Sequence, residues 1–315
     1  MKKVLVMGGS YFIGKHIVNS LKKDYEVTVL NRGNKPFNDS LVHELVCDRN
    51  DEGLLKEVLS PYMFNYVIDI SGFTKHQSAL LLNALDLCQL EKFIYISTSA
   101  AYNIQVLTPP FKEGDLTGGD SPFKDYAKNK LEAEAYLLNT IDNDKLIILR
   151  PPLVYGEDNY ILRERLIFYL LDNDLPIYIP SSNNLVSFVY VKDLAQDIKR
   201  LIENIIPVGL YNVGNKHPHS FKHWVELCAK VMDKSPNIVF VDPKDTRFEL
   251  RYYFPFFDYD NVLSVEKIKQ FSPNETPMED GLKKAFLDYL TVKDTIKLPE
   301  KMRLMREKIN ELNNQ

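Results

Sequence analysis

The sequence predicts an α/β protein with a doubly wound parallel sheet and a smaller C-terminal lobe. Short apolar runs that suit buried strands alternate with stretches whose apolar residues recur at helical spacing, and this alternation indicates βαβ units. Polar or glycine residues follow several of the runs, as expected where strands end at a binding edge. The chain has 315 residues, of which 45% are hydrophobic, so it can bury the core of one large domain or two coupled ones.

The elements follow from these patterns in chain order. Strands are predicted at residues 4–6, 26–31, 41–47, 66–70 and 90–96. Helices are predicted from residue 12 onward, at 51–59, at 77–87 and in the second half of 121–138. A helix at 159–172 and a strand at 175–179 leave the sheet, residues 185–191 return to the domain that contains it, and 208–214 form another strand. Strands that alternate with helices in this way pair in parallel, with helices on both faces.

The turn between the first strand and its helix is a candidate phosphate site. Gly8 suits the tight turn and Gly14 suits close helix packing, whereas Tyr11 stands where the usual fingerprint has its middle glycine. Free N–H groups and the positive end of a helix dipole favour a pyrophosphate here. The alternative is a glycine turn without a ligand. The candidate residues are Gly8, Gly9, Ser10, Tyr11, Phe12, Ile13 and Gly14.

The end of the second strand usually selects the cofactor, and here it carries Asn31 and Arg32. A guanidinium without a neighbouring carboxylate favours a 2′-phosphate and therefore NADP over NAD. The alternative for Arg32 is a solvated surface position. Other candidate contacts at strand ends are Asp48, Arg49, Ser71 and Gly72.

Tyr126 and Lys130 stand one helical turn apart in an Ala-, Glu- and Lys-rich stretch, so a helix places them on one face. An ammonium beside a phenol stabilises the phenolate and lowers its pKa, which allows general acid or base chemistry. The same spacing also occurs by chance on ordinary amphipathic helices.

Several segments in a fixed order resemble the extended short-chain dehydrogenase/reductase superfamily, which contains the NAD-dependent epimerases and dehydratases. These are the glycine turn, the hydroxyl cluster Ser97-Thr98-Ser99, Tyr126-xxx-Lys130, residues 150–156 (RPPLVYG) and residues 188–195 (FVYVKDLA). The resemblance covers about residues 1–290. The GGxxFIG turn is similar to an atypical subgroup that also includes chloroplast stem-loop RNA-binding proteins.

The resemblance implies a Rossmann-like cofactor domain and a substrate-binding lobe. Tyr126 is implied as the acid/base, Lys130 as the group that lowers its pKa and holds the nicotinamide ribose, and Thr98 as the partner of the reacting oxygen, with Ser99 as the fallback. Asp48 and Pro152 are implied as cofactor contacts. The implied domains are residues 1–156 with 185–216 for NAD(P) and 157–184 with 217–297 for the substrate. The charge and apolar pattern of residues 298–315 predicts an amphipathic tail that docks either on its own lobe or on a partner.

Two positions depart from nucleotide-sugar enzymes of this superfamily. Leu153 and Val186 stand where those enzymes commonly have Asn and Arg, so polar contacts to a substrate nucleotide or diphosphate are missing. Arg247 and Arg251 are candidates to replace them, although their segment also reads as an ordinary packed element.

Composition restricts partners and location. A net charge of −4 and the lack of a basic stripe argue against nucleic acid. Cys47, Cys88 and Cys228 are widely spaced, and His217, His219 and His223 have no carboxylate or thiol at ligand spacing, so we predict reduced thiols and no metal site. No apolar run approaches membrane-spanning length, and we expect a cytoplasmic monomer or homodimer that binds a small molecule.

Two functions of different class follow. The favoured one is an NAD(P)-dependent epimerase, dehydratase or reductase of a sugar or nucleotide-sugar-like substrate. The other is a protein of the same fold that binds cofactor without catalysis and works by binding RNA or another macromolecule.

Overall fold

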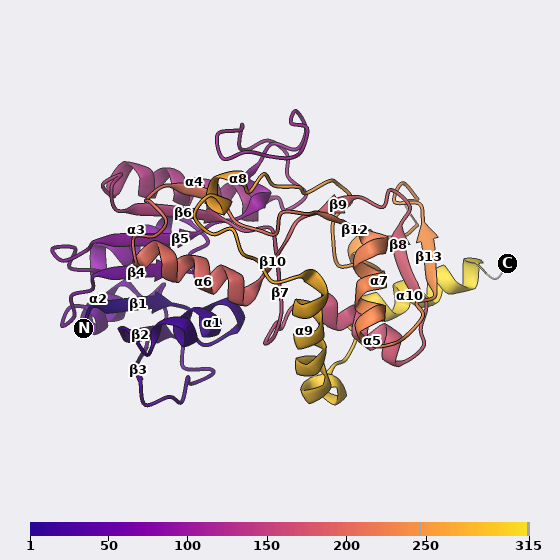
Figure 1. Cartoon of the computed structure of the whole chain (residues 1–315), viewed down its shortest axis with the longest axis horizontal. Helices are drawn as coiled ribbons and strands as arrows, with labels where there is room; N and C mark the ends of the chain where they lie inside the picture. Colours follow the sequence, from indigo (N-terminus) through magenta and orange to yellow (C-terminus); the bar gives the residue numbers. More distant parts are fainter. Residues whose placement is uncertain (246, 314–315) are drawn as a thin grey trace.

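The computed structural model describes residues 1–245 and 247–313 and is built around a seven-stranded sheet (Figure 1). The strand order is β11-β6-β5-β4-β1-β2-β3, and every neighbouring pair is parallel. The strands are β1 (Lys3–Met7), β2 (Glu26–Asn31), β3 (Val42–Val46), β4 (Tyr66–Asp69), β5 (Lys92–Ile96), β6 (Leu146–Arg150) and β11 (Leu210–Asn212). The order reverses between β1 and β4, which confirms the doubly wound α/β prediction.

Helices cover both faces of this sheet. α1 (Phe12–Leu21) packs with α6 (Val191–Ile202), and α3 (Lys75–Ala84) packs with both α2 (Glu52–Leu59) and α4 (Asp125–Thr140). Val4 and Val6 of β1 belong to the core that contains the α1 and α6 side chains, whereas Leu5 and Met7 belong to the core that contains the α2, α3 and α4 side chains. The short apolar run of β1 is therefore buried on both faces, as a central parallel strand requires.

A second group of elements lies to the other side of the sheet's carboxyl edge (Figure 1). It contains α5 (Glu164–Asp172), β8 (Ile177–Pro180), α7 (Phe221–Val231), β13 (Ile238–Val241), α9 (Met278–Val292) and α10 (Glu300–Asn313). We call this group the small lobe. β7 (Leu153–Tyr155) pairs with β10 (Phe188–Tyr190), and β9 (Leu185–Val186) pairs with β12 (His219–Ser220), between it and the sheet. The domain boundaries given above stay predictions.

Two predicted helices differ from the observed ones at their ends. α3 begins at Lys75 because the Thr74 hydroxyl caps it by accepting from the Gln77 N–H, and it ends at Ala84, where Leu85 takes an extended conformation. The helix predicted from residue 159 begins at Glu164. Asp158 has a φ of 62°, and the Asn159 side chain accepts from the Ile161 N–H, so residues 157–163 form a loop instead.

The C-terminal tail is helical and docks on its own chain. Met302 and Ile309 of α10 are buried in the main core, and Met305 packs against it. The Arg306 guanidinium donates to the Pro176 carbonyl next to β8 and lies 4.9 Å from the centre of the Tyr178 ring. The apolar face of the tail is thus covered within the molecule.

Candidate active site

The glycine turn is as tight as the sequence predicts. Gly8 has a φ of +92°, which favours glycine, and a Cβ on Gly14 would lie 2.2 Å from the Gly8 carbonyl oxygen. A Cβ on Gly9 would lie 2.7 Å from a Val29 methyl group. Phe12 is buried, and Ile13 packs against the same core. The first turn of α1 is therefore pressed directly against the backbone that precedes it.

Tyr11 stands at the position of the missing glycine with its ring turned outward. The ring is 46% exposed and packs edge-on against Tyr160, with 5.9 Å between ring centres. The Lys35 ammonium lies 4.9 Å from the centre of the same ring. A bulky residue is tolerated here because its side chain leaves the turn.

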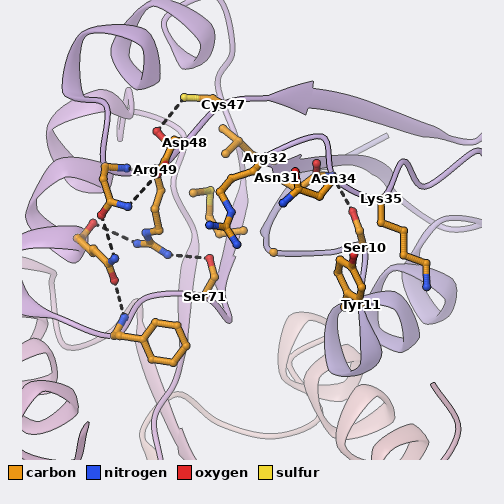
Figure 2. Close-up of a pocket in the computed structure, with 16 residues that line it drawn as sticks. Ser10, Tyr11, Asn31, Arg32, Asn34, Lys35, Cys47, Asp48, Arg49 and Ser71 are labelled. Carbon is orange, nitrogen blue, oxygen red and sulfur yellow. Dashed lines mark hydrogen bonds between the residues drawn. The ribbon is translucent and has the colours of Figure 1, made fainter. Parts of the chain in front are cut away.

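A cavity of 360 Å³, the first cavity, opens beyond the carboxyl ends of β1, β2 and β4 (Figure 2). It has the place and the glycine turn that a dinucleotide requires. Of the predicted cofactor contacts, Gly8, Ser10, Tyr11, Asn31, Arg32, Asp48, Arg49 and Ser71 line it. Gly9, Phe12, Ile13, Gly14, Gly72, Lys130 and Pro152 do not, and Pro152 lies half-buried between β6 and β7.

Asn31 is used to brace the turn. Its Nδ2 donates to the Ser10 hydroxyl and to Glu44, both at 2.6 Å, and its Oδ1 accepts from the Gly33 N–H. Arg32 is exposed, reaches into the space between Ser71 and Ser10 in Figure 2, and makes no ion pair or hydrogen bond with any described residue. Its charge lowers the pKa of the Asp48 carboxyl, although a hydrogen bond from the Asn50 N–H contributes most to that shift.

Arg49, in contrast, is committed to an internal ion pair. Its guanidinium is buried and donates to both carboxylate oxygens of Asp69, at 2.7 and 3.0 Å, and to the Ser71 hydroxyl at 2.9 Å. Asp69 also accepts from the Gly72 N–H, where a Cβ would lie 2.4 Å from the carboxylate. The pair therefore shapes the loop after β4 and presents Ser71 to the first cavity.

The predicted catalytic residues gather next to the first cavity. Phe73 lines that cavity, and its ring centre is 6.0 Å from that of Tyr126 and 5.1 Å from the Lys130 ammonium. Thr98, which follows β5, is buried and accepts from the Ala100 N–H through its hydroxyl. The loop after β4, the end of β5 and helix α4 thus bring together Phe73, Thr98, Tyr126 and Lys130, which are far apart in the chain.

The pKa of Tyr126 differs from the expectation that Lys130 lowers it. Burial of its hydroxyl end raises the pKa, although the residue as a whole is 37% exposed, and a hydrogen bond with Thr98 and the Arg163 charge partly offset this. The Lys130 ammonium instead donates to the carbonyls of Gly72 and Ile96, at 2.7 and 2.6 Å, and burial lowers its pKa to about 8. In this structure Tyr126 is a phenol at neutral pH.

A buried network supports the strand end that carries Thr98. The Arg150 guanidinium donates to both oxygens of Glu134, at 3.1 and 2.6 Å, and the Ser97 hydroxyl donates to the same carboxylate. Arg150 ends β6, Ser97 follows β5, and Glu134 belongs to α4. The network therefore ties the helix of Tyr126 to the sheet edge.

The predicted substrate residues separate into two places. Leu153, Val186 and Arg251 line a second cavity of 40 Å³, together with Arg163, which the sequence analysis missed. Ser99 lies behind that cavity and accepts from Asn261, which lines it. Arg247 lines a different cavity beside α10 and pairs with Asp245 at 2.7 Å.

Sequence reasoning also missed Lys35, Asp69 and Phe73. Lys35 follows Arg32 in the same loop, and Asp69 ends a strand, so both carried a local signal. Phe73 and Arg163 carried none, because they acquire their place only through packing.

Within residues 1–245 and 247–313, no group of three or more His, Cys, Asp and Glu side chains is arranged to hold a metal ion. The same residues include no helix that combines the length and apolarity needed to cross a membrane.

A family model and related sequences both show which family this chain belongs to. Residues 4–214 match the NAD-dependent epimerase/dehydratase family. The 41 kDa chloroplast stem-loop binding protein b of Arabidopsis thaliana is 31% identical over 85% of this chain and 73% of its own. The mouse dTDP-D-glucose 4,6-dehydratase is 26% identical over 90% of this chain and 87% of its own.

Solved structures share the fold. The UDP-glucose 4-epimerase of Thermotoga maritima superposes with a TM-score of 0.75 at 20% identity, covering 92% of this chain and 99% of that one. The UDP-glucuronic acid 4-epimerase of Bacillus cereus, solved with UDP-glucuronic acid and NAD, gives 0.74 at 20% identity over 92% and 99%.

Proposed function

Because this chain belongs to the NAD-dependent epimerase/dehydratase family, we propose that it oxidises or reduces a carbinol or carbonyl carbon of a sugar-like substrate. The observation that supports this most directly is the position of Phe73, which lines the first cavity and also contacts Tyr126 and Lys130. A proton-transfer group therefore stands at the edge of the space that suits a dinucleotide.

The residues that would hold the dinucleotide are the glycine turn for the pyrophosphate and Arg32 with Lys35 for the adenosine end. When bound, its nicotinamide accepts a hydride from the carbinol carbon or returns one to the carbonyl carbon. Arg32 and Lys35 have no carboxylate partner among the described residues, and this supports a preference for NADP over NAD.

Tyr126 donates and accepts the proton that accompanies hydride transfer. Its raised pKa keeps it a phenol at neutral pH, so it donates its proton to a carbonyl oxygen as the hydride arrives at carbon. In the opposite direction the phenolate left by that proton donation takes the proton back from the carbinol oxygen, while the hydride leaves the carbon with its electron pair. Thr98 stabilises the phenolate by a hydrogen bond, and the buried Lys130 holds the loop at Gly72 that borders the first cavity.

Replacing Tyr126 tests the proposal. Tyr126→Phe should reduce turnover by about 10² to 10⁴ and leave cofactor affinity intact, since only the proton-transfer group is lost. Turnover is measured as reduced nicotinamide formed or consumed with a panel of sugars, sugar acids, sugar phosphates and nucleotide sugars. Tyr136→Phe on the same helix, whose ring packs against the core, is the matched control. Full turnover in Tyr126→Phe would refute the assignment.

The second candidate function is RNA binding without catalysis, favoured by one relative that is named a stem-loop binding protein. The net charge of −4 weighs against it. A mobility-shift titration of stem-loop RNA separates the two candidates. Tight, salt-dependent RNA binding would favour the RNA-binding candidate if, in addition, neither Tyr126→Phe nor Tyr136→Phe abolished turnover.

A further inference from the structure

The second cavity combines charge and apolar surface in an unusual way. Leu153 and Val186 line it, as do Phe123 and Phe257, which form an edge-to-face pair with 4.7 Å between ring centres. Arg163 and Arg251 reach it from α5's N-terminus and from η2 (Leu250–Tyr252). Phe123 also lies 6.2 Å from Tyr126, measured between ring centres, so the second cavity adjoins the proposed proton-transfer group.

Neither guanidinium has a carboxylate partner among the described residues. Six of the ten arginines, at positions 49, 150, 165, 200, 247 and 303, pair with Asp or Glu. Within residues 1–245 and 247–313, Arg163 donates only to the Val154 carbonyl, at 3.0 Å, and Arg251 donates only to the Pro255 carbonyl. Two cations that share one cavity without an anion are a costly arrangement, which a ligand anion would relieve.

Among the described residues, Glu164 forms no ion pair with either guanidinium, although its charge and that of Arg163 attract each other. Glu164 is buried, and its Oε1 accepts from the Gly156 N–H at 3.1 Å and from Asn159 at 2.9 Å. Burial raises the pKa of this carboxyl. The charge of Arg163 reaches Arg251, whose pKa it lowers together with burial, so the two guanidiniums act on the same small volume.

A third polar group in the same cavity lacks a partner. Asn261 is only 4% exposed, its Nδ2 donates to the Ser99 hydroxyl at 3.1 Å, and its Oδ1 has no hydrogen-bond partner among the described residues. A buried acceptor without a donor is destabilising. A ligand hydroxyl group would satisfy it.

The size of the cavity restricts the ligand. Its 40 Å³ holds a few water molecules, since roughly 10–15 Å³ is needed for one. A carboxylate or phosphate group fits this space, and a nucleotide does not. The apolar side chains of Leu153 and Val186 also offer no donor to a second phosphate.

We infer that Arg163 and Arg251 bind the anionic group of a compact sugar acid or sugar monophosphate, while Asn261 accepts a hydrogen bond from one of its hydroxyl groups. Arg251 is already held over the Phe257 ring, 4.6 Å from its centre, so little freedom is lost on binding. The inference rests on the proposed function and specifies its substrate class: a single sugar with one anionic group close to the reacting carbon, in place of a nucleotide sugar.

Calorimetry on cofactor-loaded protein tests the inference with four titrants: glucuronate, glucose 6-phosphate, glucose and UDP-glucose. At least one of the two anionic sugars should bind about 10-fold or more tighter than glucose, because each charge-assisted contact contributes about that factor. Glucuronate as the tighter ligand identifies a carboxylate site, and glucose 6-phosphate identifies a phosphate site.

Variants separate the subsite from general effects. Arg251→Ala should weaken the anionic sugar about 10- to 100-fold and Arg251→Lys less, because a point charge replaces the planar fork. Arg163→Gln should weaken the same binding. If Arg163→Gln unfolds because the contact with Val154 is lost, the Arg251 variants still test the inference. Arg303→Ala on α10, which removes the same charge from an exposed pair with Glu307, should change nothing.

Two outcomes overturn the inference. One is equal affinity for glucose and both anionic sugars. The other is micromolar binding of UDP-glucose that Arg251→Ala leaves unchanged. If hydride transfer with UDP-glucose were then observed, the proposed function would still hold and only the inference about the subsite would be wrong. Conversely, Arg251-dependent binding of an anionic sugar without any hydride transfer would support the subsite and refute the proposed function alone.

Discussion

Arg32 follows the strand end on which the proposed preference for NADP depends. Asn31 has an amide where a carboxylate would accept hydrogen bonds from the ribose hydroxyls, and this amide is already bonded to Ser10, Glu44 and Gly33. Arg32 is left with its guanidinium toward the first cavity (Figure 2). The same local sequence therefore braces the turn and leaves a cation available to a phosphate.

Arg32→Ala should weaken NADP by roughly 1 to 3 kcal/mol, the range for a lost charge-assisted contact, and should leave NAD nearly unchanged. Titration of both dinucleotides by calorimetry measures this. Lys23→Ala, which removes an exposed cation that precedes β2 and lies outside the cavity lining, serves as the control. Tighter binding of NAD than of NADP, unaffected by Arg32→Ala, would contradict the proposed cofactor choice.

Lys130 gives the molecule a pH-dependent stability. Its pKa falls from 10.5 unfolded to about 8 folded because the ammonium is buried. Between these pH values the unfolded chain binds the proton that the folded chain has released, so stability rises with pH through this window and the penalty is fully present below pH 8.

Lys130→Met removes that penalty. As the pH rises from 8 to 10.5, the free energy of unfolding of the wild type should therefore increase by about 3 kcal/mol relative to that of Lys130→Met, since one pKa unit corresponds to about 1.4 kcal/mol. Urea denaturation of both proteins at several pH values measures the difference. A difference that stays constant across this range would show that the ammonium is not desolvated.

At the scale of elements, α4 and α10 show two uses of an amphipathic helix. α4 places Lys130 and Glu134 on the face that the sheet buries, where they make directed contacts with Ile96 and Arg150. α10 uses its apolar face to close the small lobe, and it buries Met302 and Ile309. α4 thus holds polar side chains in fixed places at the candidate site, and α10 contributes apolar packing.

Ile309→Ala should cost about 2 to 5 kcal/mol of unfolding free energy, because the residue is 1% exposed and its loss leaves a cavity. Leu304→Ala on the same helix, where the side chain is 49% exposed, should cost no more than about 0.5 kcal/mol. Chemical denaturation measures both. Equal costs at the two positions would mean that α10 does not dock as described.

At the scale of the whole molecule, the first cavity exists only in the folded chain. Gly8, Arg32 and Ser71 come from the ends of β1, β2 and β4 and meet only when the sheet forms. A dinucleotide that binds there must stabilise the folded state.

Saturating NADP, at a hundred times its dissociation constant, should raise the free energy of unfolding by about 2.7 kcal/mol. Thermal denaturation with increasing NADP measures the shift. The curve should move to higher NADP concentration in Arg32→Ala, whereas the corresponding curve for NAD should not. Absence of any stabilisation by either dinucleotide would remove the basis of the proposed function.

The sequence by itself determined the strands of the main sheet other than β6, the glycine turn and the placement of Tyr126 and Lys130 on one helix face. These features depend on short windows: apolar runs, the position of glycine, and the periodicity of a helix. β2 and its polar end were predicted with the observed bounds, and the order of the motifs indicated the family.

Only the tertiary structure decided which charged groups are paired and which are free. Arg49 pairs with Asp69, while Arg163 and Arg251 line one cavity and pair with no carboxylate of the described residues. It also decided that burial raises the pKa of Tyr126 while the neighbouring ammonium points to backbone carbonyls. Pairing and desolvation depend on contacts between segments that are distant in the chain, and no local pattern encodes which segments meet.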